Sequence, residues 1–252
     1  MRQPPGEGTP APFDRSPCPA GAPDGPPSQV EAALESALAV VKPRLRGWVH
    51  AGTFPLVLAG SAVLVALAPT VQGRLASVVF GATAALTFGT SALYHRGTWS
   101  PRWQRLLKRL DHGNIFLVIA GTYTPFAILL LAPGDARLLL TIVWIGALAG
   151  VLFRVLWVEA PRWLYTPAYV ALGWVAVFYA RAMYATGGAT LVALLAAGGL
   201  LYTLGAVVYG IRRPNPSPRW FGFHEVFHVL TVVAFMVHYA AVSLAVYRGP
   251  LR

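Results

Sequence analysis

The sequence predicts an all-α, polytopic membrane protein with seven transmembrane helices and a cytoplasmic N-terminus. Three observations lead to this prediction. The 252 residues are 56% hydrophobic and only 12% charged, which is about half the charged share of an average soluble domain. Apolar intervals of membrane-spanning length recur along the chain. Lys and Arg residues are concentrated in alternate connections between these intervals.

The N-terminal segment differs from the predicted transmembrane domain, which covers residues 43–252. Residues 1–28 are rich in Pro and Gly and contain no apolar run. We expect a disordered tail there, because such a segment cannot bury enough surface to fold. Residues 29–42 have a short amphipathic pattern with Glu31 and Glu35 on one face. This pattern predicts a helix that lies on the membrane surface or packs against the bundle, since a spanning helix needs about 20 residues.

The predicted spans are the apolar intervals that come close to the length of about 20 residues needed to cross a hydrocarbon core. They fall at 51–69, 75–95, 113–132, 138–157, 163–182, 189–211 and 226–247. A glycine turn at 186–190 separates the fifth span from the sixth. Arg154 lies near the end of the fourth span, and we expect its guanidinium to extend to the membrane surface.

Basic residues are divided unequally between the two sides of this arrangement. The connections on the N-terminal side hold thirteen Lys and Arg residues, from Lys42 to Arg219, and the opposite side holds five. By the positive-inside rule the N-terminus is cytoplasmic. The basic residues lie between apolar stretches and do not cluster with polar and aromatic residues. This distribution excludes a nucleic-acid partner. We therefore expect a multi-pass protein of the inner (plasma) membrane whose partners are membrane lipids.

Histidines and one aspartate gather at the predicted inner ends of three spans. His224 and His228 lie one helical turn apart, so both imidazoles can reach a single metal ion. His95 ends the second span and Asp111 opens the third, on the same side of the membrane. Three imidazoles with an open position form the ligand set of a catalytic zinc. Ser91 precedes His95 by one turn and shares its helix face.

Other interpretations of these residues stay open at this point. Interfacial histidines also occur without a metal, and H-E-x-x-H is a zinc-protease signature in which Glu225 would be the general base. Glu225 also suits the stabilisation of a helix N-terminus. His238 lies ten residues beyond His228, about 15 Å deeper at 1.5 Å per residue, so we expect a hydrogen-bonded core residue. His50 has no spaced partner and receives no role. The single Cys18 excludes a multi-cysteine metal site.

Three motifs occur in a specific order along the chain. They are S-x3-H at 91–95, LDHGNIFLVIAGTYTP at 110–125 and HEVFHVLTVVAFMVH at 224–238. In spacing and order they resemble the haemolysin III family, the bacterial branch of the progestin and adipoQ receptor family, to which alkaline ceramidases are more distantly similar. The resemblance covers roughly 43–248 and implies seven helices with a cytoplasmic amino terminus. The segment RGWVHAG at 46–52 departs from the acidic, Asn-containing motif that the family often has there.

The resemblance also implies roles for individual residues. His95, His224 and His228 would be the zinc ligands. Asp111 would hold or activate the water at the zinc, and Ser91 would support the site.

Three functions are compatible with such a site. The first is a zinc-dependent hydrolase of lipid amides or esters, similar to a ceramidase, with Asp111 as general base and Ser91 as a hydrogen-bond donor to the oxyanion. The second is a membrane sensor or receptor-like protein in which a structural zinc links the second, third and seventh helices. The third is membrane lysis, for which the family is named, although mostly apolar spans offer no evident pore lining. In each case we expect the zinc site near the cytoplasmic side.

Overall fold

The computed structural model describes residues 43–217 and 219–248, so the predicted tail of 1–28 and the predicted surface helix of 29–42 lie outside the described residues. The described part is all-helical and contains no β-strand, which confirms the all-α part of the predicted fold class. In chain order its helices are α2 (Trp48–Leu67), α3 (Val71–Arg96), α4 (Pro101–Leu130), α5 (Pro133–Leu156), α6 (Arg162–Gly173), the 3₁₀ helix η1 (Trp174–Tyr179), α7 (Ala180–Ile211) and α8 (Phe223–Arg248).

Apolar side chains cover the outside of the helices as well as their inner faces. Large side chains such as Leu56, Ile145 and Phe178 are 61%, 63% and 86% exposed. Within the described ranges, six helical segments are long and apolar enough to cross a membrane. An extended apolar outer surface of this kind suits contact with lipid and not with water. The chain therefore has the architecture of a multi-pass membrane protein.

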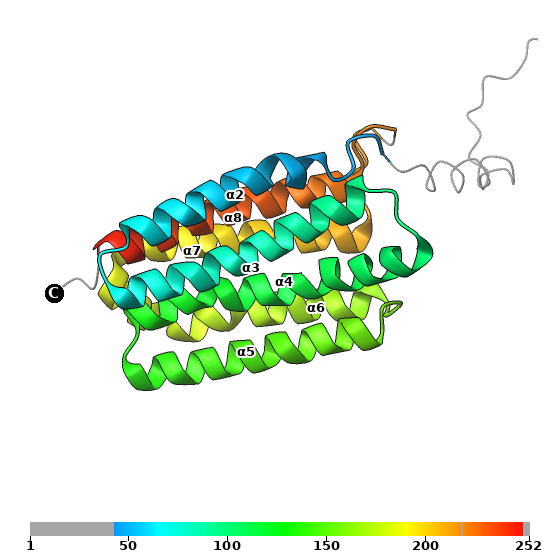
Figure 1. The fold of residues 1–252 in the computed structure, drawn as a ribbon. Helices are drawn as coiled ribbons and strands as arrows, with labels where there is room; N and C mark the ends of the chain where they lie inside the picture. Colours follow the sequence, from blue (N-terminus) through cyan, green and yellow to red (C-terminus); the bar gives the residue numbers. More distant parts are fainter. Residues whose placement is uncertain (1–42, 218, 249–252) are drawn as a thin grey trace, which may run out of the picture. The chain divides into compact units, whose positions relative to one another are not determined.

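Helix α4 forms the centre of the bundle. It contacts α3, α5, α6, α7 and α8, and the helices lie side by side (Figure 1). In the most apolar stretch of α4, 67% is buried inside the protein. This share is larger than in any other candidate membrane span among the described residues. Phe116, Tyr123 and Phe126 are among the core side chains of α4. Polar residues near the start of α4 are thus held between the neighbouring helices.

A buried polar network joins α3 to α4. Thr87 Oγ1 lies 2.9 Å from the carbonyl oxygen of Thr83 and 3.1 Å from that of Asn114. Asn114 Nδ2 donates to Thr90 Oγ1 and to the carbonyl oxygen of Leu86, both at 3.1 Å. Because hydrogen bonds are strong in a low-dielectric interior, these contacts fix the register of α3 against α4.

The segment from Arg162 to Ile211 folds back on itself. Tyr165 and Tyr209 bring their hydroxyl oxygens within 3.1 Å, and Trp174 Nε1 donates to Thr203 Oγ1 at 2.9 Å. A straight helix would hold positions 165 and 209 roughly 65 Å apart. Gly188 has φ 79° and ψ 175° inside α7, a backbone conformation that favours glycine. The chain therefore reverses at the predicted glycine turn of 186–190 and continues as an antiparallel limb.

The prediction that Arg154 extends to the membrane surface is wrong. Arg154 is 1% exposed, and its guanidinium donates to the carbonyl oxygens of Trp157 at 3.2 Å and Val158 at 3.0 Å. The guanidinium also lies 4.2 Å from the centre of the Tyr165 ring. The carbonyl groups at the end of α5 lack helical partners, so they can accept hydrogen bonds from this guanidinium inside the protein.

Helices α3 and α4 pack closely at Gly121, where an added Cβ would overlap the side chain of Thr83. We expect Gly121→Ala to lower the free energy of unfolding by about 1–3 kcal/mol, the usual cost of overpacking. Gly134→Ala is the matched control, because a Cβ there meets nothing within 4 Å. Thermal unfolding in detergent compares the two variants, and an equal loss in both would contradict the close approach.

Candidate metal centre

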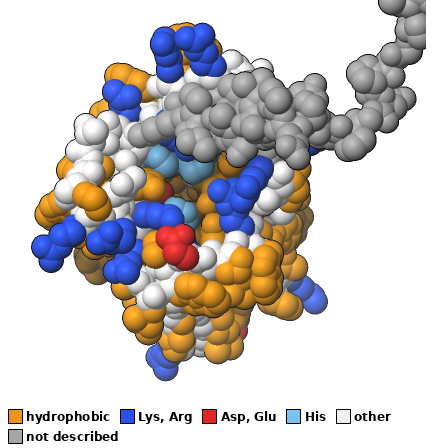
Figure 2. Space-filling model, turned by 90° about the vertical axis from the view of Figure 1, so that its right-hand side faces the viewer, with side chains coloured by type: hydrophobic (Ala, Val, Ile, Leu, Met, Phe, Trp, Pro, Cys, Tyr) orange, Lys and Arg blue, Asp and Glu red, His pale blue; other side chains and the backbone are white. Residues whose placement is uncertain are grey.

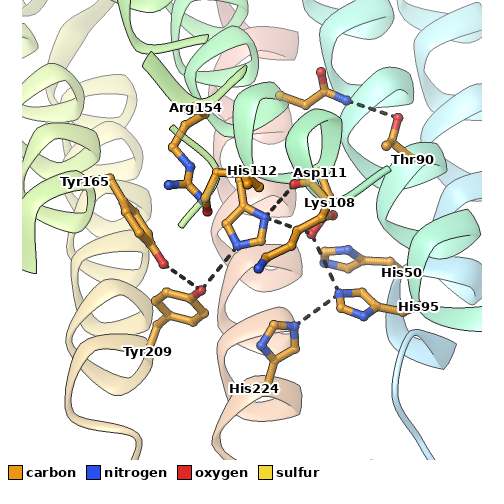
Figure 3. Close-up of polar contacts among 12 residues, drawn as sticks. His50, Thr90, His95, Lys108, Asp111, His112, Arg154, Tyr165, Tyr209 and His224 are labelled. Carbon is orange, nitrogen blue, oxygen red and sulfur yellow. Dashed lines mark hydrogen bonds and ion pairs between the residues drawn. The ribbon is translucent and has the colours of Figure 1, made fainter. Parts of the chain in front are cut away.

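Three helices bring the predicted site residues together, and Figure 3 shows His95, Asp111 and His224 of this group close to one another. His95 lies in the last turn of α3, and Asp111 is the eleventh of the 30 residues of α4. His224 and His228 lie in the first two turns of α8. These residues are far apart in the sequence, so their convergence depends on the packing of α3 and α8 against the central α4.

The three histidines form a compact, buried group. Each offers one ring nitrogen, and these nitrogens all lie within 4.8 Å of one another. His95 Nε2 is 3.2 Å from His224 Nε2. The residues His95 and His228 are only 6% and 4% exposed. Two imidazole ligands bound tetrahedrally to zinc at about 2.0–2.1 Å would lie roughly 3.3 Å apart, so this spacing fits a metal.

A buried nitrogen of His228 supports the same conclusion. His228 Nε2 is shielded from solvent and has no hydrogen-bond partner within residues 43–217 and 219–248. Leaving a buried polar atom without a partner costs about 1–3 kcal/mol. A metal ion among the three rings would use this lone pair. The donor set is therefore suitable for a metal ion, since imidazole nitrogens bind zinc and several other transition metals.

Asp111 and Ser91 lie beside this group. Asp111 Oδ2 is 3.8 Å from His95 Nε2, which is too long for a direct hydrogen bond and leaves room for a bridging water. Ser91 is 1% exposed, and with Asp111, His224 and His228 it lines a cavity of about 70 Å³. A cavity of this size holds several water molecules. The arrangement can place a water between a carboxylate and the histidine group.

A second polar chain, which the sequence did not reveal, begins at His112. Its Nδ1 donates to the carbonyl oxygen of Lys108 at 2.8 Å, and its Nε2 lies 3.4 Å from Tyr209 Oη (Figure 3). Tyr209 in turn pairs with Tyr165, and Tyr169 donates to the carbonyl oxygen of His112 at 2.9 Å. Asp111 Oδ2 is also 3.8 Å from His112 Nδ1. The carboxylate thus lies between two imidazoles. Only the adjacency of His112 to Asp111 could have indicated this.

His50, to which sequence reasoning gave no role, belongs to the same region. It is the third residue of α2, is 3% exposed and lines the same cavity. Its ring nitrogens lie 3.0 and 2.8 Å from Nδ1 of His228. Its position at the inner end of the first span, at the depth of His228, was the signal available in the sequence.

Glu225 is engaged in a structural contact. It is 1% exposed, and Arg46 Nε donates to its Oε1 while the backbone N–H of Gly222 donates to its Oε2 at 2.9 Å. The carboxylate thus lies in the first turn of α8, where a negative charge stabilises the helix. It also joins α8 to the segment that precedes α2. Because both oxygens have donors, Glu225 is poorly placed to act as a general base.

Basic side chains surround the opening above the histidines. Figure 2 shows histidine side chains inside a hollow at the end of the bundle, among Lys and Arg residues. Lys108 Nζ lies 3.0 Å from Glu159 Oε1 in the connection between α5 and α6. This hydrogen bond lowers the pKa of the exposed Glu159 carboxyl below its ordinary value. The surroundings of the opening are therefore predominantly cationic.

A larger, mainly apolar cavity of about 200 Å³ adjoins the histidine site. The two cavities share the lining residues Thr87, Ile115, Tyr169, Phe227 and Thr231. His238 lines the larger cavity, and its Nε2 lies 3.2 Å from the carbonyl oxygen of Leu195, apart from the three-histidine group. This placement agrees with the prediction that His238 is a hydrogen-bonded core residue.

The fold and the buried histidine group define a class of protein: a helical, multi-pass membrane protein with a metal-binding type of site inside the bundle. Within that class, the model of the family described as haemolysin-III related matches residues 38–239. The chain therefore belongs to the haemolysin III family, and the resemblance drawn from its motifs is confirmed.

Individual relatives agree with this assignment. The chain is 35% identical over 109 residues to "Hemolysin-3" of Bacillus cereus, covering 43% of this chain and 50% of that protein. It is 38% identical over 107 residues to "Hemolysin-3 homolog" of Bacillus subtilis (strain 168), covering 41% and 49%. In these matches the chain spans about half the length of the relatives. A shorter match, 42% over 59 residues, joins it to "Adiponectin receptor protein" of Drosophila melanogaster, covering 20% and 13%.

Proposed function

We propose that this protein is a zinc-dependent hydrolase of lipid amides or esters, with its site inside a seven-span bundle near the cytoplasmic face. The observation that carries the proposal is the buried group of His95, His224 and His228, with a carboxylate beside it and an apolar cavity adjoining it. Each part of this arrangement corresponds to one requirement of lipid hydrolysis.

The proposed topology has seven crossings. The limbs of the 162–211 segment on either side of Gly188 each exceed the length of about 20 residues that crosses the hydrocarbon core. Counting them separately adds one crossing to the six candidate segments. The histidine group lies at the end of the bundle where most basic residues lie, and the positive-inside rule assigns that end to the cytoplasm.

The ligand set supports zinc. His95, His224 and His228 would hold the ion, since three imidazoles with an open position are typical of catalytic sites. When bound, zinc supplies Lewis acidity that polarises a carbonyl group and lowers the pKa of a coordinated water. Charge within a membrane protein is costly, and such ionisable groups in the bundle interior are functional candidates by default.

Asp111 and Ser91 would carry the proton and hydrogen-bond chemistry of the chain itself. Asp111 Oδ2, 3.8 Å from His95 Nε2, is positioned to orient a water and to accept its proton. Ser91 lines the same cavity, so its hydroxyl can donate a hydrogen bond to a substrate carbonyl oxygen as negative charge develops there. His112 Nδ1 also lies 3.8 Å from Asp111 Oδ2, although it donates its hydrogen to the carbonyl oxygen of Lys108.

The apolar cavity supports a lipid substrate. Its lining by side chains such as Val118, Phe126 and Leu195 suits an acyl chain, and its shared wall with the polar cavity would bring the reactive group to the histidines. The same apolar lining argues against a lytic pore, which would require a polar lumen.

A receptor-like function with a structural zinc is the second candidate. It is favoured by the match to a protein named as an adiponectin receptor. In that case the ion would tie α3 to α8 and no turnover would occur.

Hydrolysis by the purified protein distinguishes the two candidates. We expect wild-type protein in liposomes to cleave at least one amide or ester lipid from a panel of fluorescent lipids. A strong chelator should abolish the cleavage, and excess zinc should restore it. If no lipid in a broad panel is cleaved while zinc is bound, the hydrolase proposal is wrong and the receptor-like one is favoured.

A further inference from the structure

We propose that His50 is a positioning residue of the metal centre: the face of its imidazole ring receives the Nδ1 hydrogen of His228 and so leaves the Nε2 lone pair of His228 available to the metal. The inference rests on the metal centre of the proposed function but not on hydrolysis.

The contact between the two imidazoles is short and buried. His228 Nδ1 lies almost equally far from the two ring nitrogens of His50, at 3.0 and 2.8 Å, and the rings meet edge to face with centroids 3.9 Å apart. His228 Nδ1 therefore points at the face of the His50 ring, where an N–H group interacts favourably with the π electrons. The two residues are 3% and 4% exposed. Within residues 43–217 and 219–248, the ring of His50 is the polar partner of His228 Nδ1, and His228 Nε2 has none.

This contact determines which nitrogen of His228 can bind a metal. A neutral imidazole has one N–H donor and one lone-pair nitrogen. The face of the His50 ring attracts an N–H group and repels a lone pair, so the hydrogen is on Nδ1. The lone pair is then on Nε2, the buried nitrogen without a hydrogen-bond partner. Histidines that bind metals usually donate their second nitrogen to such an outer partner, which fixes both the tautomer and the orientation of the ring.

The position of His50 is itself determined by packing. Its ring packs against Phe88 of α3, with centroids 4.9 Å apart at 71°. Its helix also contacts both α3 and α8, the helices that carry the three-histidine group. His50 therefore adds α2 to a centre whose candidate ligands come from α3 and α8.

Two substitutions separate positioning from packing. His50→Leu keeps a side chain of similar size but removes the hydrogen-bond acceptor, whereas His50→Gln supplies a side-chain oxygen that can accept from Nδ1. His238→Leu is the matched control, because it makes the same change at a buried histidine outside the group. Zinc affinity is measured in detergent by competition with a chromophoric chelator, and thermal stability is measured with and without zinc.

We expect His50→Leu to weaken zinc binding by about 10–100-fold, the usual effect of losing an outer partner. His50→Gln should stay close to wild type, and His238→Leu should leave zinc affinity unchanged. His50→Leu should also reduce the rise in Tm that zinc produces. If His50→Leu gives no folded protein, His50→Asn takes its place, because its shorter side chain does not reach His228.

Two results would overturn the proposal. Unchanged zinc affinity in His50→Leu would show that the contact does not matter to the metal. Equal losses in His50→Leu and His50→Gln would show that His50 acts by packing or as a ligand. A wild-type protein that binds no zinc would instead refute the metal centre, and this proposal with it.

Discussion

Asp111→Asn should lower the hydrolysis of a susceptible lipid by about 10²–10⁴-fold, the usual cost of losing a general base, while zinc stays bound. Asn keeps the size of Asp and can still hydrogen-bond a water, but it cannot accept a proton. The 3.8 Å between Asp111 Oδ2 and His95 Nε2 places the carboxylate outside direct contact with the histidine nitrogen. The measurements are turnover in liposomes and zinc content by metal analysis of the same sample.

Glu225→Gln is the matched control for this prediction, since it makes the same carboxylate-to-amide change at a neighbouring buried acid. Both Glu225 oxygens accept hydrogen bonds, from Arg46 and Gly222. We expect Glu225→Gln to reduce thermal stability, because the partly buried Arg46 loses its counterion, and to leave most of the turnover intact. Inactivation by Glu225→Gln together with an active Asp111→Asn would instead support a protease-like base.

Alanine at His95, His224 or His228 should remove the metal. Each substitution takes away one of three nitrogens that lie within 4.8 Å of one another. The loss in zinc affinity should exceed the roughly 10–100-fold effect of removing an outer hydrogen-bond partner. The Tm of each variant should respond little to zinc or chelator, whereas that of the wild type should fall on chelation.

His238→Ala is the control for the alanine series. Its imidazole bonds the carbonyl oxygen of Leu195 and lines the apolar cavity, so its loss should lower stability without changing zinc content. Loss of zinc in His238→Ala as well would mean that the metal is bound elsewhere or that the fold has changed.

Most of the architecture could be predicted because the apolar composition of a short stretch of sequence is enough to identify a membrane span. The apolar intervals and the glycine turn at 186–190 are visible in the sequence, and Gly188 has the positive φ that such a turn uses. The burial of Arg154 could not be predicted, because its acceptors are the carbonyl groups of Trp157 and Val158 at a helix end. The position of that end depends on tertiary packing.

The grouping of His95, His224 and His228 could be anticipated because topology places them at one membrane depth. Depth alone does not give direction around a helix axis, so the contact of His50 with His228 was missed. The chain from His112 to Tyr209 was missed for the same reason. Both contacts depend on how helices from distant parts of the sequence are rotated against each other.

The most direct test of the account is anomalous X-ray scattering at the zinc absorption edge, from crystals of protein purified without chelator. We predict one strong peak among the imidazoles of His95, His224 and His228, the group whose nitrogens lie within 4.8 Å of one another. The absence of a peak there, in protein supplied with zinc throughout purification, would contradict the metal centre.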